Sequence, residues 1–424
     1  MAPKIRAPHA RVSIHCRPHA SLRPGAIVRW ALLALALALA AGGLQAAVPA
    51  PVPAQAASHG PGPVQSPARA GAASAAAAPV RPDGASAAGA RPAGAGTGAP
   101  YRLRIVGNLG ALSQYAKREA PFWTQDLPRL SGGRFSASIV PFDRAGVPGI
   151  EMLRLIELGV VPLGTVLMSS LTAQYPQYTA PDLPGLNPTL ADLRSAVQAF
   201  RPYLQAALRE RHHFEMLAVY VYPAQVLFCQ KSLSGLSDLV GRRVRVSSAA
   251  QADFIAALGG IPVYTGFGQI VASLQAGDSE CAVTGTMSGN TLGLHRMTRY
   301  LYPLPITWGL SFFGANDEAW NAMPQDLRAL LLRELPKLEE AVWRDAETET
   351  AEGVACNSGA ASCTRGEKGS MVVVPVSDAD EARRQRLLRE AVLPNWLRRC
   401  SGNCAEVWNA TLGPARGIPA TRGP

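Results

Sequence analysis

Apolar and polar positions along residues 101–424 form short runs of two kinds. Runs such as "YRLRIVG" and "RFSASIVPF" alternate apolar and polar residues in the way that strands do. Between strand-like runs lie stretches with apolar residues at helical spacing, such as "PGIEMLRLIELG", in which Gly159 marks the end of the helix. From Tyr101 the order is strand, helix, strand, helix, strand. This order predicts a parallel sheet with helices on both faces.

The same order returns after the middle of the chain. A long helix predicted over 189–211 leads to two strands, "FEMLAVYVYP" and "VLFCQ". The strand-like runs "RVRVSS", "IPVYT" and "ECAVTG" follow, separated by two helical stretches, and "ITWGLSFFGAN" leads to an amphipathic helix over 317–350. Two α/β units joined by crossing segments predict a hinged clamshell. The carboxyl ends of the strands in both lobes should face one cleft, where open α/β sheets bind ligands.

The first hundred residues differ from the rest in composition and hydrophobic pattern. The apolar run "WALLALALALAA" follows Arg29 and precedes small residues, so we expect a signal peptide over 1–46 with a long n-region. An uncleaved anchor helix is the alternative, although the run is shorter than the roughly 20 apolar residues that a membrane span needs. Residues 47–100 are mostly Ala, Pro, Gly and Ser and predict a disordered linker.

The folded part of the chain is then expected to be the α/β domain over 101–424. We expect its first lobe to span about 101–220 and 305–400, and its second lobe about 225–304. The N-terminal hundred residues hold nine basic residues and one acidic residue, whereas residues 101–424 carry 32 basic and 29 acidic residues. The basic character of the chain therefore belongs mainly to the leader and linker. We expect no nucleic-acid partner.

The cysteines suggest an oxidising compartment. Cys356 with Cys363, and Cys400 with Cys404, lie at short spacings in polar surroundings, which predicts two local disulfides. Zinc binding is the alternative, but neither spacing is C-x-x-C, and we expect no metal and no cofactor. Two further cysteines, Cys229 and Cys281, lie in apolar strand-like runs and are expected to be buried and unpaired.

Arg245 is an unusual residue for a strand inside a sheet. It alternates with Val244 and Val246, and it lies near the carboxyl end of its strand, where the cleft should be. A guanidinium there offers a planar pair of donors that suits a carboxylate. An ion pair with Asp253 or Asp278 is the structural alternative. Arg243, nearer the start of the strand, is expected to reach solvent.

The segments "DLVGRRVRV", "FIAALGGIPV" and "GFGQIVASLQAGDSECAVTG" resemble the central signature of the solute-binding proteins of tripartite ATP-independent periplasmic (TRAP) transporters. Weaker likenesses are "SGGRFSASIVPF" and "ELGVVPLGTVLMSS", so the resemblance extends over most of 101–412. It implies a periplasmic-binding-protein clamshell with several crossing segments and long linking helices. It also implies that Arg245 binds the carboxylate of an organic acid.

The chain departs from that family pattern at several positions. Gln269 and Glu280 replace a usual glutamate and aspartate, and Cys281 follows where the pattern has glycine. Many members carry a second arginine at the position of Ala224, next to Gln225. Without a second cation, the pocket should favour a monocarboxylate whose remainder is apolar or hydroxylated. We expect the ligand to be bound by Arg245, Asn108, Ser169, Gln225, Phe267, Thr284 and Trp308.

Little in the sequence favours catalysis. There is no G-x-S-x-G, no H-E-x-x-H and no phosphate-binding glycine loop. We therefore expect a monomeric periplasmic receptor that delivers a small organic acid to integral membrane transporter subunits. A tether through an uncleaved signal anchor remains open. A binding protein of another transport or sensing system, or an enzyme on the same fold, is the alternative function.

Overall fold

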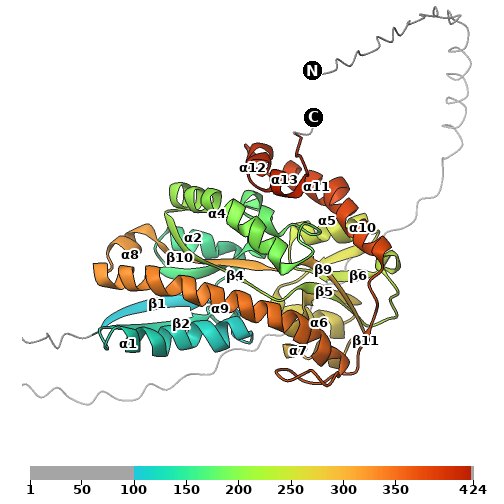
Figure 1. Cartoon of the computed structure of the whole chain (residues 1–424), viewed down its shortest axis with the longest axis horizontal. Helices are drawn as coiled ribbons and strands as arrows, with labels where there is room; N and C mark the ends of the chain where they lie inside the picture. Colours follow the sequence, from blue (N-terminus) through green and yellow to red (C-terminus); the bar gives the residue numbers. More distant parts are fainter. Residues whose placement is uncertain (1–99, 422–424) are drawn as a thin grey trace, which may run out of the picture. The chain divides into compact units, whose positions relative to one another are not determined.

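The strands of the domain form two separate sheets. A computed structural model describes residues 100–421, so the predicted signal peptide and nearly all of the predicted linker lie outside the described residues. The described residues belong to one compact unit. The first sheet has the order β2-β1-β3-β10-β4 and the second has the order β11-β9-β5-β8-β6-β7 (Figure 1).

The first sheet begins with the strands that the sequence predicts. Its members are β1 (Tyr101–Gly107), β2 (Phe135–Pro141), β3 (Leu163–Leu167), β4 (Phe214–Val221) and β10 (Leu310–Asn316). β1 is parallel to β2 and β3, as the alternating strand–helix order requires. β10, however, lies antiparallel to both β3 and β4. The predicted parallel unit is therefore confirmed for β1, β2 and β3, and the crossing strand β10 enters the same sheet in the opposite direction.

The second sheet repeats this arrangement. Its members are β5 (Gln225–Cys229), β6 (Arg243–Val246), β7 (Ile261–Tyr264), β8 (Cys281–Gly285), β9 (Tyr300–Thr307) and β11 (Val372–Val373). β6 is parallel to β7 and β8, whereas β5 pairs antiparallel with β8 and β9. β11 pairs with β9 at the edge of this sheet, although its residues fall within the range predicted for the first lobe.

Helices cover the sheets and connect them. After β1 the chain is continuously helical over 113–130, and this helix includes the π-helical segments η1 (Gln114–Glu119) and η2 (Phe122–Asp126) and ends with α1 (Leu127–Leu130). The next helices are α2 (Met152–Glu157), α3 (Met168–Leu171) and α4 (Leu190–His212). Around the second sheet lie α5 (Ala249–Ala257), α6 (Ile270–Gln275) and α7 (Thr286–Thr291).

The helix α9 (Gln325–Ser358) extends along both sheets. It follows α8 (Asp317–Asn321), contacts η1 and β4 on the first-sheet side, and contacts α7, β9 and β11 on the second-sheet side (Figure 1). Its inward side chains, among them Leu331, Leu335 and Val342, are buried. The last helices are α10 (Asp378–Leu387), α11 (Leu393–Arg399), α12 (Cys404–Ala410) and α13 (Leu412–Arg416), and this segment contacts α4 and α5.

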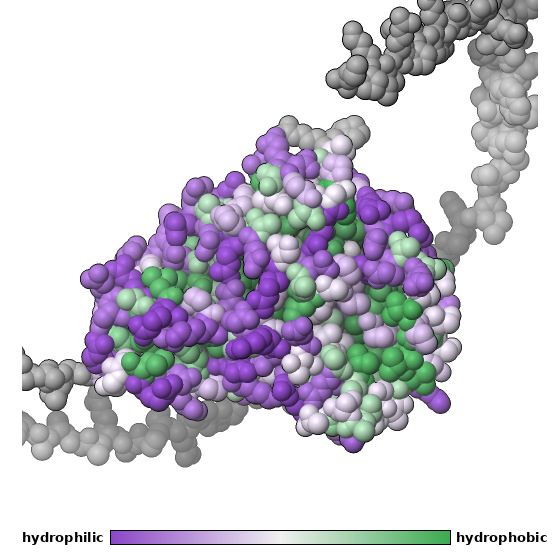
Figure 2. Space-filling model, viewed as in Figure 1, coloured by the Kyte–Doolittle hydropathy of each residue, from purple (hydrophilic) through white to green (hydrophobic). Residues whose placement is uncertain are grey.

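Apolar side chains fill the space between sheets and helices. Residues of both sheets contribute to the larger buried cluster, which includes Phe228, Phe254 and Trp396. A second cluster around Trp123 and Phe313 lies between the first sheet, η2 and α9. On the face shown in Figure 2, hydrophilic side chains cover most of the first-sheet side, and apolar ones gather on the side of the second sheet.

Three disulfides link the cysteines of the domain. Cys356–Cys363 and Cys400–Cys404 are paired as predicted. Cys229 and Cys281 also form a disulfide, so the prediction that they are unpaired is wrong. They occupy directly opposed positions on the antiparallel strands β5 and β8, a pairing that brings two positions 52 residues apart in sequence into contact.

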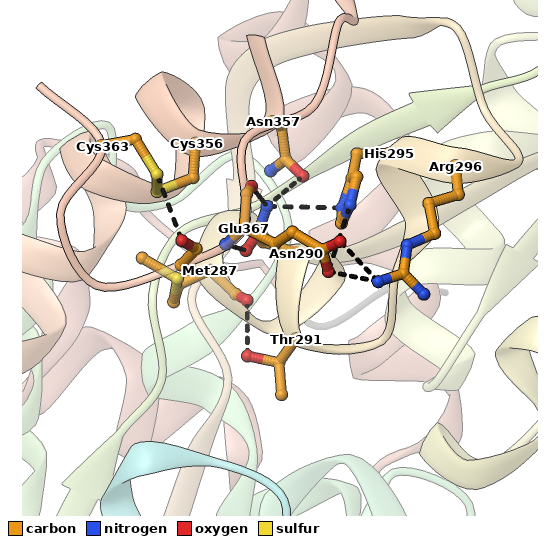
Figure 3. Close-up of polar contacts among 10 residues, drawn as sticks. Met287, Asn290, Thr291, His295, Arg296, Cys356, Asn357, Cys363 and Glu367 are labelled. Carbon is orange, nitrogen blue, oxygen red and sulfur yellow. Dashed lines mark hydrogen bonds and ion pairs between the residues drawn. A yellow bond between two sulfur atoms is a disulfide. The ribbon is translucent and has the colours of Figure 1, made fainter. Parts of the chain in front are cut away.

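A buried amide holds the segment that follows the Cys356–Cys363 disulfide against α7 (Figure 3). Asn290 donates from Nδ2 to the Glu367 carbonyl (2.7 Å) and accepts at Oδ1 from the Glu367 backbone N–H (2.8 Å). The Glu367 carboxylate pairs with Arg296 and lies 3.6 Å from His295 Nε2. These contacts give the segment after α9 a fixed path over α7.

None of the helices within 100–421 combines the length and apolar character needed to cross a membrane. In the same part of the chain, His, Cys, Asp and Glu side chains form no group of three or more that is suited to hold a metal ion.

Candidate functional site

A cavity of about 720 Å³ opens between the two sheets. Its first-sheet wall comes from segments that follow β1, β2 and β3, including Leu109, Phe142 and Ser169. Its second-sheet wall comes from segments at the carboxyl ends of β6, β7 and β8, including Arg245 and Thr284. The cavity thus lies outside the carboxyl ends of these strands, at the edge where the sequence predicts a cleft.

Arg245 extends from β6 into the wall of this cavity. The side chain is only 2% exposed, and backbone carbonyls hold its guanidinium in place. Nε and Nη2 donate to the Thr265 carbonyl (3.1 and 2.7 Å), and Nη1 donates to the Val283 carbonyl (2.8 Å). A guanidinium has five N–H groups. These contacts use three, so one N–H on each Nη remains for a ligand in the cavity.

Arg245 has no acidic partner among the residues that the structure describes. Asp253 instead pairs with Arg399 at 2.5 Å. Asp278 offers only its backbone carbonyl, and it does so to Arg243. Burial lowers the pKa of Arg245 to about 9, which still leaves the side chain charged at neutral pH. A buried cation without a counterion is costly, so an anion entering the cavity would supply the missing charge.

Arg243 lies two residues earlier on β6 and has a different environment. It is exposed, and it donates to the carbonyls of Gly277 and Asp278 at the opposite end of the strand. Its guanidinium lies 3.9 Å from Glu280, which also pairs with Lys231. Arg243 therefore acts as a surface residue and does not line the cavity.

Five of the seven predicted ligand-binding residues line the same cavity. They are Arg245, Ser169, Gln225, Phe267 and Thr284. Ser169 lies in the first turn of α3 rather than at the end of a strand, because β3 already ends at Leu167.

Asn108 lies behind the cavity wall. It is fully buried, and its Oδ1 accepts hydrogen bonds from the hydroxyls of Tyr222 and Ser311. Its backbone N–H donates to Glu119 at 2.7 Å. Burial raises the pKa of the Glu119 carboxyl to about 7. Tyr222 lines the cavity in front of this network, so Asn108 supports the wall without forming part of it.

Trp308 also lies outside the cavity lining. It connects β9 to β10, and its backbone N–H donates to Asp182 at 2.9 Å. The next residue, Gly309, donates to the other oxygen of Asp182 at 2.7 Å. The indole Nε1 donates to the Asn187 carbonyl at 3.1 Å. Trp308 therefore shapes a crossing segment between the two sheets and does not cover the cavity.

Asp143 is a lining residue that the sequence reasoning missed. It follows β2 and is the only charged residue of the described chain that lines this cavity besides Arg245. Its Oδ1 accepts from the Gly110 N–H at 2.8 Å. The rule that pointed to Arg245, position at the carboxyl end of a strand, also applies to Asp143.

Comparison with known proteins supports the resemblance in the sequence. Residues 109–362 match the family of bacterial extracellular solute-binding proteins, family 7. A search of curated proteins found no match.

Solved structures with the same fold include three receptors with known ligands. An extracytoplasmic solute receptor of Bordetella pertussis that binds pyroglutamic acid is 20% identical, with a TM-score of 0.64 over 73% of this chain and 98% of that chain. A TRAP periplasmic solute-binding protein from Desulfovibrio salexigens with bound orotic acid is 18% identical (TM-score 0.64; 73% and 96%). One from Sulfurospirillum deleyianum with bound succinate is 16% identical (TM-score 0.63; 74% and 98%).

At these identities the structures establish a shared two-lobed fold. The family match covers more than half of the chain and includes Arg245 and its cavity. The chain belongs to family 7 of the bacterial extracellular solute-binding proteins, the solute receptors of TRAP transporters.

Proposed function

We propose that this protein captures a small organic acid outside the cytoplasm and delivers it to a TRAP-type secondary transporter. The observation that carries the proposal is Arg245, a buried cation in the cavity wall that has two unused N–H groups and no acidic partner within the described residues. A carboxylate can accept both N–H groups at once, and charge-assisted pairs of this kind are among the stronger polar contacts.

We infer further that the ligand carries one carboxylate. Ala224, at the position where many family members have a second arginine, is fully buried and adds no charge. Asp143 is the other charged residue of the lining, and it would repel a second carboxylate. Pyroglutamic acid and orotic acid, bound by two of the relatives, have a single carboxyl group, whereas succinate has two. The ligands of these relatives therefore support an organic acid as the ligand, and the charges in the cavity lining support an acid with one carboxylate.

The four other predicted residues that line the cavity each receive a role. Gln225, Ser169 and Thr284 offer polar groups for the ligand, and Phe267 offers an apolar surface. Because the lining comes from both sheets, a bound acid would contact both lobes and favour the closed state. The closed form would then be the one that the membrane subunits of the transporter bind. We propose that the receptor acts as a monomer in the periplasm.

A ligand screen tests this function. Native mass spectrometry of the purified full chain should detect a co-purified acid, and a thermal-shift screen of organic acids should raise the unfolding temperature. Pyroglutamate, orotate and succinate form the first panel, each paired with its uncharged amide. We expect monocarboxylates to stabilise the protein and their amides to have little effect. Equal stabilisation by acids and amides would contradict the role of Arg245, and a preference for succinate would contradict the monocarboxylate.

A further inference from the structure

We propose that Gln251 is a positioning residue that turns the amide NH2 of Gln225 into the cavity, so that Gln225 donates to the ligand as the missing second arginine would. The proposal rests on the proposed function, binding of an organic acid in this cavity. Gln251 belongs to α5 and does not line the cavity itself, whereas Gln225, the first residue of β5, does.

A backbone N–H determines how the Gln251 amide is oriented. The Ser247 N–H points at the Gln251 side chain at 2.9 Å, and a backbone N–H can only donate. The atom it meets must therefore be the amide oxygen of Gln251, which also accepts from the Ser247 hydroxyl at 3.1 Å. The Gln251 NH2 group must then lie on the other side of the amide. Gln251 is 2% exposed, so water has little access to this arrangement.

The Gln251 amide in turn determines the orientation of the Gln225 amide. The Gln251 NH2 lies 2.6 Å from the Gln225 side chain, so the atom it meets must be the Gln225 oxygen. Gln251 also donates to the Thr307 hydroxyl (2.9 Å), and that hydroxyl donates in turn to the Gln225 oxygen (3.2 Å). The Gln225 oxygen thus accepts two hydrogen bonds within the protein.

The NH2 group of Gln225 is left for the cavity. It has no hydrogen-bond partner among the described residues, yet it is not one of their buried unpaired atoms. It lies beside Gly309, which also lines the cavity and whose missing side chain makes room for it: a Cβ there would approach Nε2 to 2.5 Å. Both the orientation of the group and the space around it therefore favour donation to a bound molecule.

This arrangement narrows the class of ligand. Arg245 and Gln225 present donors, and neither offers a free acceptor to the cavity. A ligand that pairs with both needs a carboxylate and a second acceptor oxygen, as in 2-hydroxy acids, 2-oxo acids and acids with a lactam or imide carbonyl. An acid whose remainder is purely hydrocarbon would leave the Gln225 NH2 unpaired and should bind more weakly.

The substitution Gln251→Glu tests the proposal, because an ionised carboxylate can only accept hydrogen bonds. It would still accept from the Ser247 N–H, and an acidic residue in the first turn of α5 suits the helix N-terminus, so folding should be retained. The Gln225 amide would turn its NH2 toward the new carboxylate and present its oxygen to the cavity. At pH 8 we expect pyroglutamate and orotate to bind roughly 10- to 100-fold more weakly, the cost of one hydrogen bond to a charged or polar acceptor.

A matched control separates this reversal from the added charge. Ser248→Asp places a carboxylate next to Gln251 and retains an N-cap residue for α5, while leaving the Gln251 amide in place. It should weaken binding by much less than Gln251→Glu. In a Gln225→Leu background, Gln251→Glu should cost no more than Ser248→Asp does, because the donor is already absent.

The pH profile gives a further readout that a purely structural role would not produce. Burial disfavours the charged form of the introduced carboxyl, so lowering the pH from 8 to 5 shifts it toward the protonated form, which can donate to the Gln225 oxygen as Gln251 does. We expect acid binding by Gln251→Glu to recover over this range. Equal binding by Gln251→Glu and Ser248→Asp at pH 8 would overturn the proposal.

The orientation can also be measured without ligand. In full-length protein labelled with 15N-glutamine, and assigned with Gln225→Leu, the Gln225 side-chain NH2 should exchange rapidly with water in the wild type and slowly in Gln251→Glu at pH 8. Slow exchange in the wild type would overturn the proposal even if neither acid binds. Failure of the proposed function would give a different result. The wild type would then bind none of the acids, and replacing Arg245 would change nothing, whatever the orientation of Gln225.

Discussion

Replacing Arg245 should remove most of the ligand affinity, and the structure allows the size of the loss to be calculated. Two N–H groups, one on each Nη, remain for the ligand after the contacts to Thr265 and Val283. A hydrogen bond between charged partners contributes about 1.5–3 kcal/mol. Losing two such bonds in Arg245→Ala therefore costs roughly 3–6 kcal/mol, which raises the dissociation constant by a factor of roughly 10²–10⁴.

Isothermal titration with the acid that stabilises the wild type most measures this loss directly. Arg243→Ala is the matched control, because it removes the same charge from the same strand at a position that does not line the cavity. We expect the control to bind within about twofold of the wild type. Arg245→Lys keeps the charge but loses the pair of parallel donors, so it should lie between the two.

Two results would refute this reasoning. Near-wild-type affinity in Arg245→Ala would show that the carboxylate is held elsewhere in the cavity. A similar loss in Arg243→Ala would show that the long-range charge of the lobe, and not the geometry at Arg245, attracts the acid. Circular dichroism of each variant without ligand checks that the fold is retained.

Three further predictions concern the framework around the cavity. Burial raises the pKa of Glu119 from 4.5 to about 7, so the folded state holds a proton that the unfolded chain has lost, and this group should cost roughly 3 kcal/mol of stability as pH rises across this range. Burial also raises the pKa of Asp182 to about 7, so Glu119→Gln should remove part of the decline seen in urea unfolding between pH 5 and 7.5, and an unchanged decline would contradict the prediction. Replacing both Cys229 and Cys281 by Ala removes a disulfide between positions 52 residues apart and should lower the free energy of unfolding, measured with denaturant, by about 4 kcal/mol. A loss below about 1 kcal/mol would count against this prediction. Gly309→Ala adds a Cβ at φ +86° next to Gln225 and should cost about 1–2 kcal/mol of stability as well as affinity, so unchanged melting and binding would argue against the close approach.

Much of the fold was predictable because its elements are specified locally. β1 spans Tyr101–Gly107 as the alternation predicted, and α4 extends over nearly the predicted range because Thr189 caps its start and His213 ends it in a left-handed conformation. The edge of each sheet that holds the cavity followed from the strand–helix order. Arg245 could be identified for the same reason, since its position within a strand places it at that edge.

Other features depend on which distant segments become neighbours. β10 lies antiparallel between β3 and β4, and Cys229 lies opposite Cys281. Both pairings join residues that are tens of positions apart in the sequence. No local pattern specifies such a pairing, because the hydrophobic alternation of a strand is satisfied by several neighbours. Sequence position predicted that Asn108 and Trp308 line the pocket. Asn108 lies behind Tyr222, which hydrogen-bonds to it, and the backbone of Trp308 is held by Asp182, so both lie outside the lining.

By itself, the sequence determined the α/β elements, the family, the cavity edge and the buried arginine that faces it. Only the tertiary structure decided that Arg245 has no acidic partner within the described residues and that Gln251 controls the direction of the Gln225 amide. The physical reason is that helices and strands arise from periodic patterns along the chain, whereas the charge balance and hydrogen-bond direction of a site arise from atoms that folding brings together.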